Sequence, residues 1–465
     1  TTGMNNVAIG YNALSAEDGH SCNIAIGAHA LEDQDAGANA YNVAVGHAAG
    51  RNVTTAINNT IIGGLAGDAL TTGSYNVALG YEALSTEDTG SRSIAIGYGA
   101  LKTQDYNGEA WNIGIGHLAG YAVTTGIRNT LVGGIAGDSI TTGSYNTAFG
   151  SHALATQTTG GGNTALGYAA LNALNHTDDT VGYNVAIGHE AGAVMTTGIY
   201  NTIIGGLAGD ALTTGNKNVA IGYKALSTED GHTGNVAIGY LALEDQNAGA
   251  DAYNTAVGYE AGKEVTTGIH NTLIGAFAGD NLAGGSNNVA IGNYALSTED
   301  THGKNVAVGY GALTLQDAGA DAYSVAVGYL AGTSISTGVQ NTVVGGLAGD
   351  ALTTGASNVA IGFRALSGED TGSLNIAIGQ DSLIALNYNG NGYNTSIGYE
   401  AGKAVSTGRK NTILGAEAGD ALTTGSNNII IGYAAAASAV GVDNEITLGD
   451  SNISTVRIPS DSTLK

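Results

Sequence analysis

The sequence has almost no cysteine or proline, few basic residues and no long hydrophobic run. Its single cysteine, Cys22, excludes an internal disulfide, so stability must come from packing and hydrogen bonding. Its single proline, Pro459, stands near the C-terminal end, as expected if nearly every earlier backbone amide is needed as a donor. Because no run of about 18 apolar residues and no signal-peptide pattern occurs, we expect no membrane insertion.

Basic residues are scarce, since 14 lysines and arginines stand against 39 acidic residues and give a net charge of −25. Without a basic patch, nucleic acid is not an expected partner. Many of the acids form pairs at equivalent places in the chain: Glu17-Asp18, Glu87-Asp88, Glu229-Asp230, Glu299-Asp300 and Glu369-Asp370. We expect a solvated acidic edge. A divalent cation bridging these loops is the alternative, but calcium-binding motifs are absent, so no cofactor is expected.

The sequence is instead rich in one repeated phrase, asparagine, aliphatic, small, aliphatic, glycine, which recurs 26 times at intervals of 17, 19 or, once, 21 residues. It begins at Asn6-Val7-Ala8-Ile9-Gly10 and fades after Gly432, with a last weak copy ending at Gly449. Four successive copies form a super-repeat of 70 or 72 residues, so four coil types can be distinguished. Examples of the first to fourth types begin at residues 76, 93, 112 and 129. Such short periods indicate a solenoid.

Within the phrase, apolar residues alternate with small ones, which is the period of a β-strand. We therefore predict an all-β, parallel β-roll or β-solenoid of about 26 short coils over residues 1–449, followed by a C-terminal cap at 450–465. The residue before the glycine, such as Ile9 or Ile62, is aliphatic or aromatic in every copy. We expect this residue, with Val7 two positions earlier, to point into the core and Ala8 to point outward.

In the fourth coil type the small middle residue of the strand becomes large. The residues at this position are Ile61, Leu131, Ile203, Leu273, Val343 and Ile413. If the middle residue faces outward, a single chain would expose these six side chains to water. They are thus candidates for an interface with a partner chain. The alternative is that a loop of the same chain covers them.

Asparagine precedes the strand in 23 of the 26 copies. Stacked asparagines can form a hydrogen-bonded ladder and accept unusual backbone angles at a turn. We therefore predict a structural ladder, which begins with Asn6, Asn23, Asn42, Asn59 and Asn76. Tyrosines follow the motif glycine or precede the asparagine, and should form columns at the surface or at an interface.

The repeat gives little indication of a catalytic site or a metal-binding site. His47, His117 and His189 recur in third-type coils four coils apart, so they cannot share a metal within one chain, and no metal site is expected. A polysaccharide-cleaving enzyme would need a groove built by insertions, but the coils differ by only two to four residues. An ice-binding face is disfavoured because Thr-Thr pairs occur in only two coils of four. We expect no enzyme activity in the repeat.

The phrase, with an alanine three residues after the glycine as at Ala13, Ala30 and Ala49, resembles the head repeats of trimeric autotransporter adhesins. The likeness covers nearly all of residues 1–449, although these coils are slightly longer than the family's. It implies a left-handed β-roll and a homotrimer.

The residues from Asn444 to Lys465 resemble the junction into an endosialidase-type intramolecular chaperone of phage tail fibres and spikes. The resemblance implies autocleavage before Ser460 with the help of Lys465, although Thr463 replaces the arginine frequent in that motif and almost all of the chaperone is missing. At the other end, Thr1 to Asn6 align with the end of a fourth-type coil and the first residue of the next coil. We expect this chain to be a segment of something longer.

Together these features predict a structural and adhesive fibre shaft of a phage-type tail fibre, extracellular or associated with a virion. Its expected partners are two further copies of the chain and a host cell-surface receptor. The head of a bacterial surface adhesin and a purely structural extracellular filament are the alternatives.

Overall fold

The computed structural model describes residues 3–19 and 22–457, and it is all-β with one three-residue strand in each of 26 coils. The chain divides into two compact units, residues 1–238 and 239–465. The first unit holds β1 (Val7–Ile9), β2 (Ile24–Ile26), β3 (Val43–Val45), β4 (Thr60–Ile62), β5 (Val77–Leu79), β6 (Ile94–Ile96), β7 (Ile113–Ile115), β8 (Thr130–Val132), β9 (Thr147–Phe149), β10 (Thr164–Leu166), β11 (Val185–Ile187), β12 (Thr202–Ile204), β13 (Val219–Ile221) and β14 (Val236–Ile238). The second holds β15 (Thr255–Val257), β16 (Thr272–Ile274), β17 (Val289–Ile291), β18 (Val306–Val308), β19 (Val325–Val327), β20 (Thr342–Val344), β21 (Val359–Ile361), β22 (Ile376–Ile378), β23 (Thr395–Ile397), β24 (Thr412–Leu414), β25 (Ile429–Ile431) and β26 (Ile446–Leu448).

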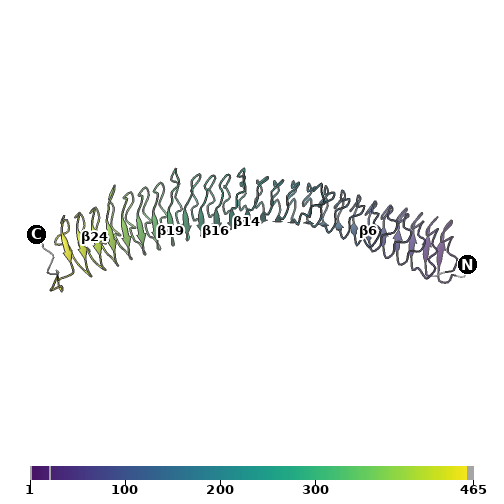
Figure 1. The fold of residues 1–465 in the computed structure, drawn as a ribbon, viewed down its shortest axis with the longest axis horizontal. Coiled ribbons are helices and arrows are strands. Elements are labelled where there is room, and N and C mark those ends of the chain that lie inside the picture. Colours follow the sequence, from purple (N-terminus) through teal and green to yellow (C-terminus); the bar gives the residue numbers. More distant parts are fainter. Residues whose placement is uncertain (1–2, 20–21, 458–465) are drawn as a thin grey trace. The chain divides into compact units, whose positions relative to one another are not determined.

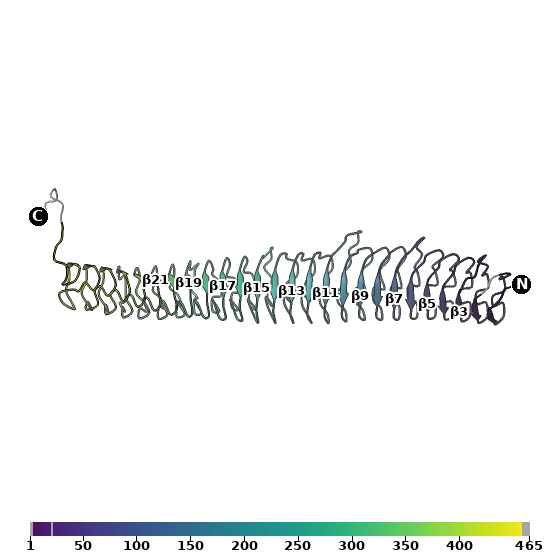
Figure 2. The same ribbon diagram turned by 90° about the horizontal axis from the view of Figure 1, so that it is seen from below.

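Within each unit, successive strands pair in parallel and in strict register (Figures 1 and 2). Ile61 of β4, for example, lies opposite Ala44 of β3 and Ala78 of β5. Because each coil pairs only with the coil before and the coil after it, equivalent residues form columns along the unit. The predicted parallel β-solenoid is confirmed.

The face of each strand that packs in the core is not the predicted one. The first and third residues were expected in the core, but the middle residue lies there instead. The middle residue is buried, with Ala25, Ala44 and Ala78 each 0% exposed, whereas residues on either side are half-buried or exposed. Phe149, expected in the core, is 54% exposed. A coil of 17 residues encloses little volume, so its core accepts alanine at this position and leaves the larger aliphatic side chains outside.

The six large middle residues are therefore not an exposed interface. The side chains of Ile61, Leu131, Ile203, Leu273, Val343 and Ile413 are all 0% exposed within the chain's own core. Space for them comes from a glycine that replaces a leucine across the coil. Ile61 is matched by Gly67, whereas Ala78 in the next coil is matched by Leu84, and a Cβ on Gly67 would lie 3.5 Å from Cδ1 of Ile61. The large residue also fills space beside the preceding coil, where Ala44 and Gly50 are both small, since a Cβ on Gly50 would lie 2.8 Å from Cδ1 of Ile61.

The corners of each coil use left-handed backbone angles. The residue before the ladder asparagine is left-handed even when its side chain is bulky, as at Tyr75 (φ 63°) and Trp111 (φ 55°). The strand-ending glycine is stricter, because Gly80 has a φ of 138° and a Cβ there would lie 2.3 Å from the carbonyl oxygen of Gly97. Only glycine allows this approach of one coil's backbone to the next.

The asparagines form the predicted ladder. Where one ladder asparagine follows another, its main-chain amide typically donates to the side-chain oxygen of the asparagine in the preceding coil. This pattern joins Asn6, Asn23, Asn42, Asn59 and Asn76 with N to Oδ1 distances of 2.8 to 3.0 Å. In some coils the side-chain amide donates to the same oxygen, as from Asn129 to Asn112. Each Nδ2 of Asn42, Asn59 and Asn76 also donates to a main-chain carbonyl 14 residues later. The side chain thus replaces main-chain bonds that the corner lacks.

The solenoid ends with β26, and residues 450–457 contain no strand. Ser460 and Lys465, the residues suggested for autocleavage, lie outside the described residues, as does Pro459. In the part of the chain that is described, no helix is long and apolar enough to cross a membrane.

Candidate functional site

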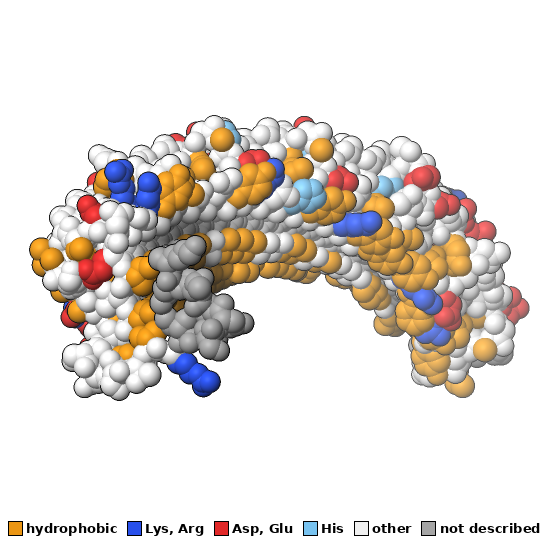
Figure 3. Space-filling view, turned by 60° about the vertical axis from the view of Figure 1, so that its left-hand side comes forward, with side chains coloured by type: hydrophobic (Ala, Val, Ile, Leu, Met, Phe, Trp, Pro, Cys, Tyr) orange, Lys and Arg blue, Asp and Glu red, His pale blue; other side chains and the backbone are white. Residues whose placement is uncertain are grey.

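The most extensive surface feature is an apolar strand face, made by the first and third residues of every strand. Its first column is valine, isoleucine or threonine and its third is aliphatic or phenylalanine throughout. Leu79, Phe149 and Leu166 are 41%, 54% and 45% exposed, and most others are half-buried. Figure 3 shows hydrophobic side chains gathered in adjacent rows. Since in-register strands lie about 4.8 Å apart, the third positions form an uninterrupted apolar strip along each unit, whereas the first position is threonine in ten of the 26 strands.

Beside the strand face, aromatic side chains stack from coil to coil. The residues that follow the motif glycine give the stack of Tyr81, Tyr98 and His117, with ring centroids 5.7 and 5.3 Å apart. In the second unit, Tyr310 stacks on Tyr329 at 5.5 Å. These tyrosines are exposed. The third-type histidines thus belong to surface stacks, as His189 does by lying against Tyr168.

A second column is formed by the residues before the ladder position, and between residues 75 and 145 it alternates aromatic and cationic side chains. The guanidinium of Arg92 lies 5.1 Å from the ring centroid of Tyr75 and 4.9 Å from that of Trp111. These three residues, with Val77, Ile94 and Ile113 of the strand face, line a surface groove of about 370 Å³. The groove is open and mostly apolar.

The acidic pairs form the expected solvated edge only through their aspartates. The first residue of each pair is buried in the core, since Glu87, Glu229, Glu299 and Glu369 are 0% exposed and Glu17 is 6% exposed. The aspartates that follow are exposed or half-buried. Glutamine occupies the same core position in other coils, for example Gln104 and Gln316. The position is therefore a polar site in the core, and the prediction failed because it treated both carboxylates of a pair alike.

Most of these glutamates are satisfied by donors from their own corner. Glu87 accepts hydrogen bonds from the main-chain amide of Gly90 at 2.6 Å and from Nε2 of Gln104 at 2.9 Å. Burial nevertheless raises the pKa of Glu87 and of Glu369 above the usual range. The pKa of Glu299 is raised to about 7, first by burial and then by the nearby Asp317 carboxylate.

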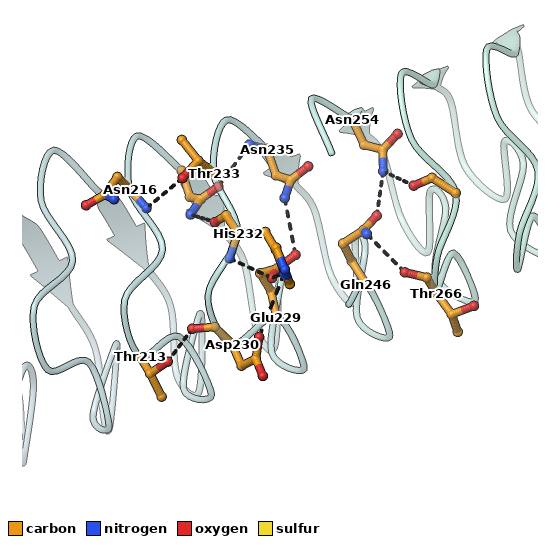
Figure 4. A network of polar contacts seen from close by, with 12 residues as sticks. Thr213, Asn216, Glu229, Asp230, His232, Thr233, Asn235, Gln246, Asn254 and Thr266 are labelled. Atoms are coloured by element: carbon orange, nitrogen blue, oxygen red, sulfur yellow. Dashed lines mark hydrogen bonds and ion pairs between the residues drawn. The ribbon is translucent and has the colours of Figure 1, made fainter. Parts of the chain in front are cut away.

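Two of these glutamates lie next to a histidine. Oε1 of Glu229 is 2.6 Å from Nδ1 of His232 and 3.0 Å from its main-chain nitrogen, and Asn235 donates to the other carboxylate oxygen (Figure 4). Asp230 is also close, with Oδ1 3.8 Å from the same ring nitrogen. Glu229 is thus engaged by partners within its own coil.

The equivalent glutamate of the next super-repeat has a different environment. Glu299, His302 and Asp317 each place a potential metal-ligating atom within 4.8 Å of the others. This cluster was missed in the sequence because only the histidines of third-type coils were compared. The available signal was a glutamate followed three residues later by histidine, which occurs at Glu17, Glu229 and Glu299.

Comparison with known protein families and with curated proteins gives no match for this chain. The candidate sites therefore rest on the geometry described above.

Proposed function

We propose that this chain is the structural shaft of a homotrimeric fibre, in which three copies bury their apolar strand faces against one another. The observation that carries the proposal is the presence of this face in every coil of both units. Burying a fully exposed aliphatic side chain is worth roughly 1.5 to 3 kcal/mol. Here an aliphatic or phenylalanine side chain recurs at the third strand position of every coil, and a second aliphatic side chain stands at the first position in 16 of the 26 strands. Because strands are in register, three identical faces can meet around one axis without a change of geometry along the shaft.

The number three follows from the resemblance of the repeats to trimeric adhesin heads. The apolar strand face supports association but is equally compatible with a dimer. The interface residues are those of the first and third strand positions, in place of the buried middle residues first considered.

We further propose that the fibre is extracellular or virion-associated and attaches to a host cell-surface receptor. Stacked aromatic side chains repeated along the surface could make many weak contacts at once, which raises avidity without a single deep pocket. A bacterial adhesin head would use the same surface. A purely structural filament would use the strand face alone.

The oligomeric state tests the shaft proposal directly by light scattering coupled to size-exclusion chromatography. A triple variant with Leu79→Lys, Phe149→Lys and Leu166→Lys places charges on the strand face and should shift the wild-type trimer toward monomer. A matched variant places three lysines at exposed threonines outside the strand face, Thr72, Thr86 and Thr142, and should remain a trimer. Circular dichroism checks that both variants keep the β-structure.

Leu131→Ala distinguishes the role of the buried strand face from that of the proposed interface face. Because Leu131 is buried in its own chain, this substitution should lower the melting temperature while the trimer persists. A monomeric wild type would refute the shaft proposal, and so would a strand-face variant that stays as trimeric as the wild type.

A further inference from the structure

The polar core around Glu299 contains a carboxylate oxygen without a hydrogen-bond donor. The Glu299 side chain is 0% exposed. Its Oε2 accepts a bond from Nδ2 of Asn305 at 3.3 Å, but its Oε1 is buried and has no hydrogen-bond partner. An unpaired buried acceptor of this kind destabilises the fold, and more so when it is charged.

The matched coils show what is missing. There, Oε1 of the glutamate accepts the main-chain amide of the residue three positions later, at 2.6 Å between Gly90 and Glu87 and at 2.7 Å between Gly372 and Glu369. Oε2 of Glu87 also accepts the side-chain amide of Gln104, the glutamine of the next coil. At Glu299 the corresponding glutamine is Gln316, and its amide instead donates to the carbonyl oxygens of Ser336 and Gly338 at 2.9 and 3.3 Å. Oε1 of Gln316 is itself buried without a partner. The main-chain amide of His302 faces the Glu299 carboxylate, but it forms no hydrogen bond with Oε1. The same part of the core thus contains two acceptor oxygens, Oε1 of Glu299 and Oε1 of Gln316, without a hydrogen bond.

Two further ligand types face Glu299. Nδ1 of His302 lies 3.9 Å from Oε1 of Glu299, and the Asp317 carboxylate of the following coil completes a set whose ligand atoms are all within 4.8 Å. His302 is 29% exposed and Asp317 is exposed, so the cluster opens to solvent on one side. The hydroxyl of Thr301 lies 3.0 Å from Nδ1 of His302; it is exposed and can turn to water instead.

We propose that Glu299, His302 and Asp317 form a binding site for a divalent transition-metal ion such as zinc. Two carboxylates and one imidazole are a ligand set that zinc accepts, with water at the remaining positions. The ion supplies the positive charge that the unpaired Glu299 oxygen lacks, and it joins two consecutive coils through Glu299 and Asp317. Calcium fits less well, because it prefers oxygen ligands alone and more of them.

Glu229 provides an internal comparison. Its Oε1 is already hydrogen-bonded to the main-chain nitrogen and to the ring Nδ1 of His232. The position equivalent to Asp317 is occupied by Asn247. This cluster therefore has neither the free oxygen nor the second-coil carboxylate. It should bind zinc more weakly than the Glu299 cluster.

The test is isothermal titration of the full chain, without a histidine tag and after chelator treatment, with zinc chloride. His302→Gly introduces the residue found at this position as Gly90 and Gly372 in related coils, so the corner should still fold. This variant and Glu299→Gln should each lose one equivalent of bound zinc relative to the wild type. The matched variant His232→Gly should retain that equivalent.

Cobalt(II) absorption gives a second measurement, since a d–d band from an imidazole-ligated ion should be present in the wild type and absent in His302→Gly. Equal zinc stoichiometry in the wild type and His302→Gly would overturn the proposal. It would also be overturned by a wild type that binds calcium but no zinc, or by one that binds no metal because a proton satisfies Glu299.

Discussion

The main-chain amide of Asn76 donates a hydrogen bond of 2.8 Å to Oδ1 of Asn59, one coil earlier. Asn76 in turn accepts from the amide of Ser93 at 2.9 Å and donates through Nδ2 to the carbonyl oxygen of Gly90 at 2.9 Å. One buried side chain therefore connects its own coil to the next and closes the corner. These contacts require both Oδ1 and Nδ2 of Asn76.

Asn76→Ala should lower the stability of the solenoid, because it leaves the amide of Ser93 and the carbonyl of Gly90 buried without their partner. Each such orphan costs roughly 1 to 3 kcal/mol. Thermal unfolding followed by circular dichroism should show a lower midpoint. Asn39→Ala, at an exposed asparagine outside the ladder, is the control and should leave the midpoint nearly unchanged. Equal midpoints for the two variants would show that the ladder contributes nothing.

Gly80→Ala should be more damaging than an ordinary glycine replacement. The added Cβ would meet the carbonyl oxygen of Gly97 at 2.3 Å, and the backbone angle of 138° is one that alanine disfavours. Backbone strain of this kind costs about 1 to 3 kcal/mol, and the clash adds to it. Thermal unfolding of the purified variant measures the loss.

Gly64→Ala is the matched control for this prediction. Its Cβ would contact only the Tyr81 ring, at 3.5 Å, and alanine stands at the equivalent position as Ala276 and Ala416. It should melt close to the wild type. If Gly80→Ala does the same, the close approach of the two backbones is not a requirement of the fold.

Stability should fall as pH rises from acid to neutral, because of the buried glutamates. Burial raises the folded-state pKa of Glu87 and Glu369 above the unfolded value near 4.5. Between the unfolded and folded pKa values the folded state holds more protons, so the free energy of unfolding decreases with increasing pH. The contribution is complete below the unfolded pKa and is lost as the pH passes through the folded pKa.

The double variant Glu87→Gln and Glu369→Gln should flatten this dependence. Melting midpoints measured from about pH 4 to pH 8, at about 0.15 M salt to screen surface repulsion, should vary less than those of the wild type. The double variant Asp18→Asn and Asp33→Asn, at two exposed positions, serves as the charge-matched comparison. An unchanged slope in the double variant would assign the pH dependence to surface charge.

The repeat made the coil count, the strand positions and the asparagine ladder predictable, because each depends on spacing alone. Which strand residues face the core was not predictable, because the alternation of Val77, Ala78 and Leu79 is the same whether the middle residue points inward or outward. One signal was present but unused: Ile61 occurs with Gly67, whereas Ala78 occurs with Leu84. The exchange of size between these two coil types indicates that both positions share one core, although third-type coils are small at both positions, as at Ala44 and Gly50.

The metal cluster could be predicted only in part. The spacing of Glu299 and His302 is visible in the sequence, but the burial of Glu299 was hidden by its neighbour Asp300, which is exposed. That the amide of Gln316 turns away from Glu299 depends on local side-chain packing, which the repeat pattern does not specify.

The strict register of neighbouring strands makes length an adjustable property of each unit. Leu79 and Phe149 occupy the same column, one before Gly80 and the other before Gly150. Removing residues 80–149 would join Leu79 to Gly150 and bring together coils of the same kinds that meet elsewhere. Duplication or loss of such a block changes the length of the solenoid and keeps the same fold. A single recombination event in the gene can therefore lengthen or shorten the protein by one super-repeat.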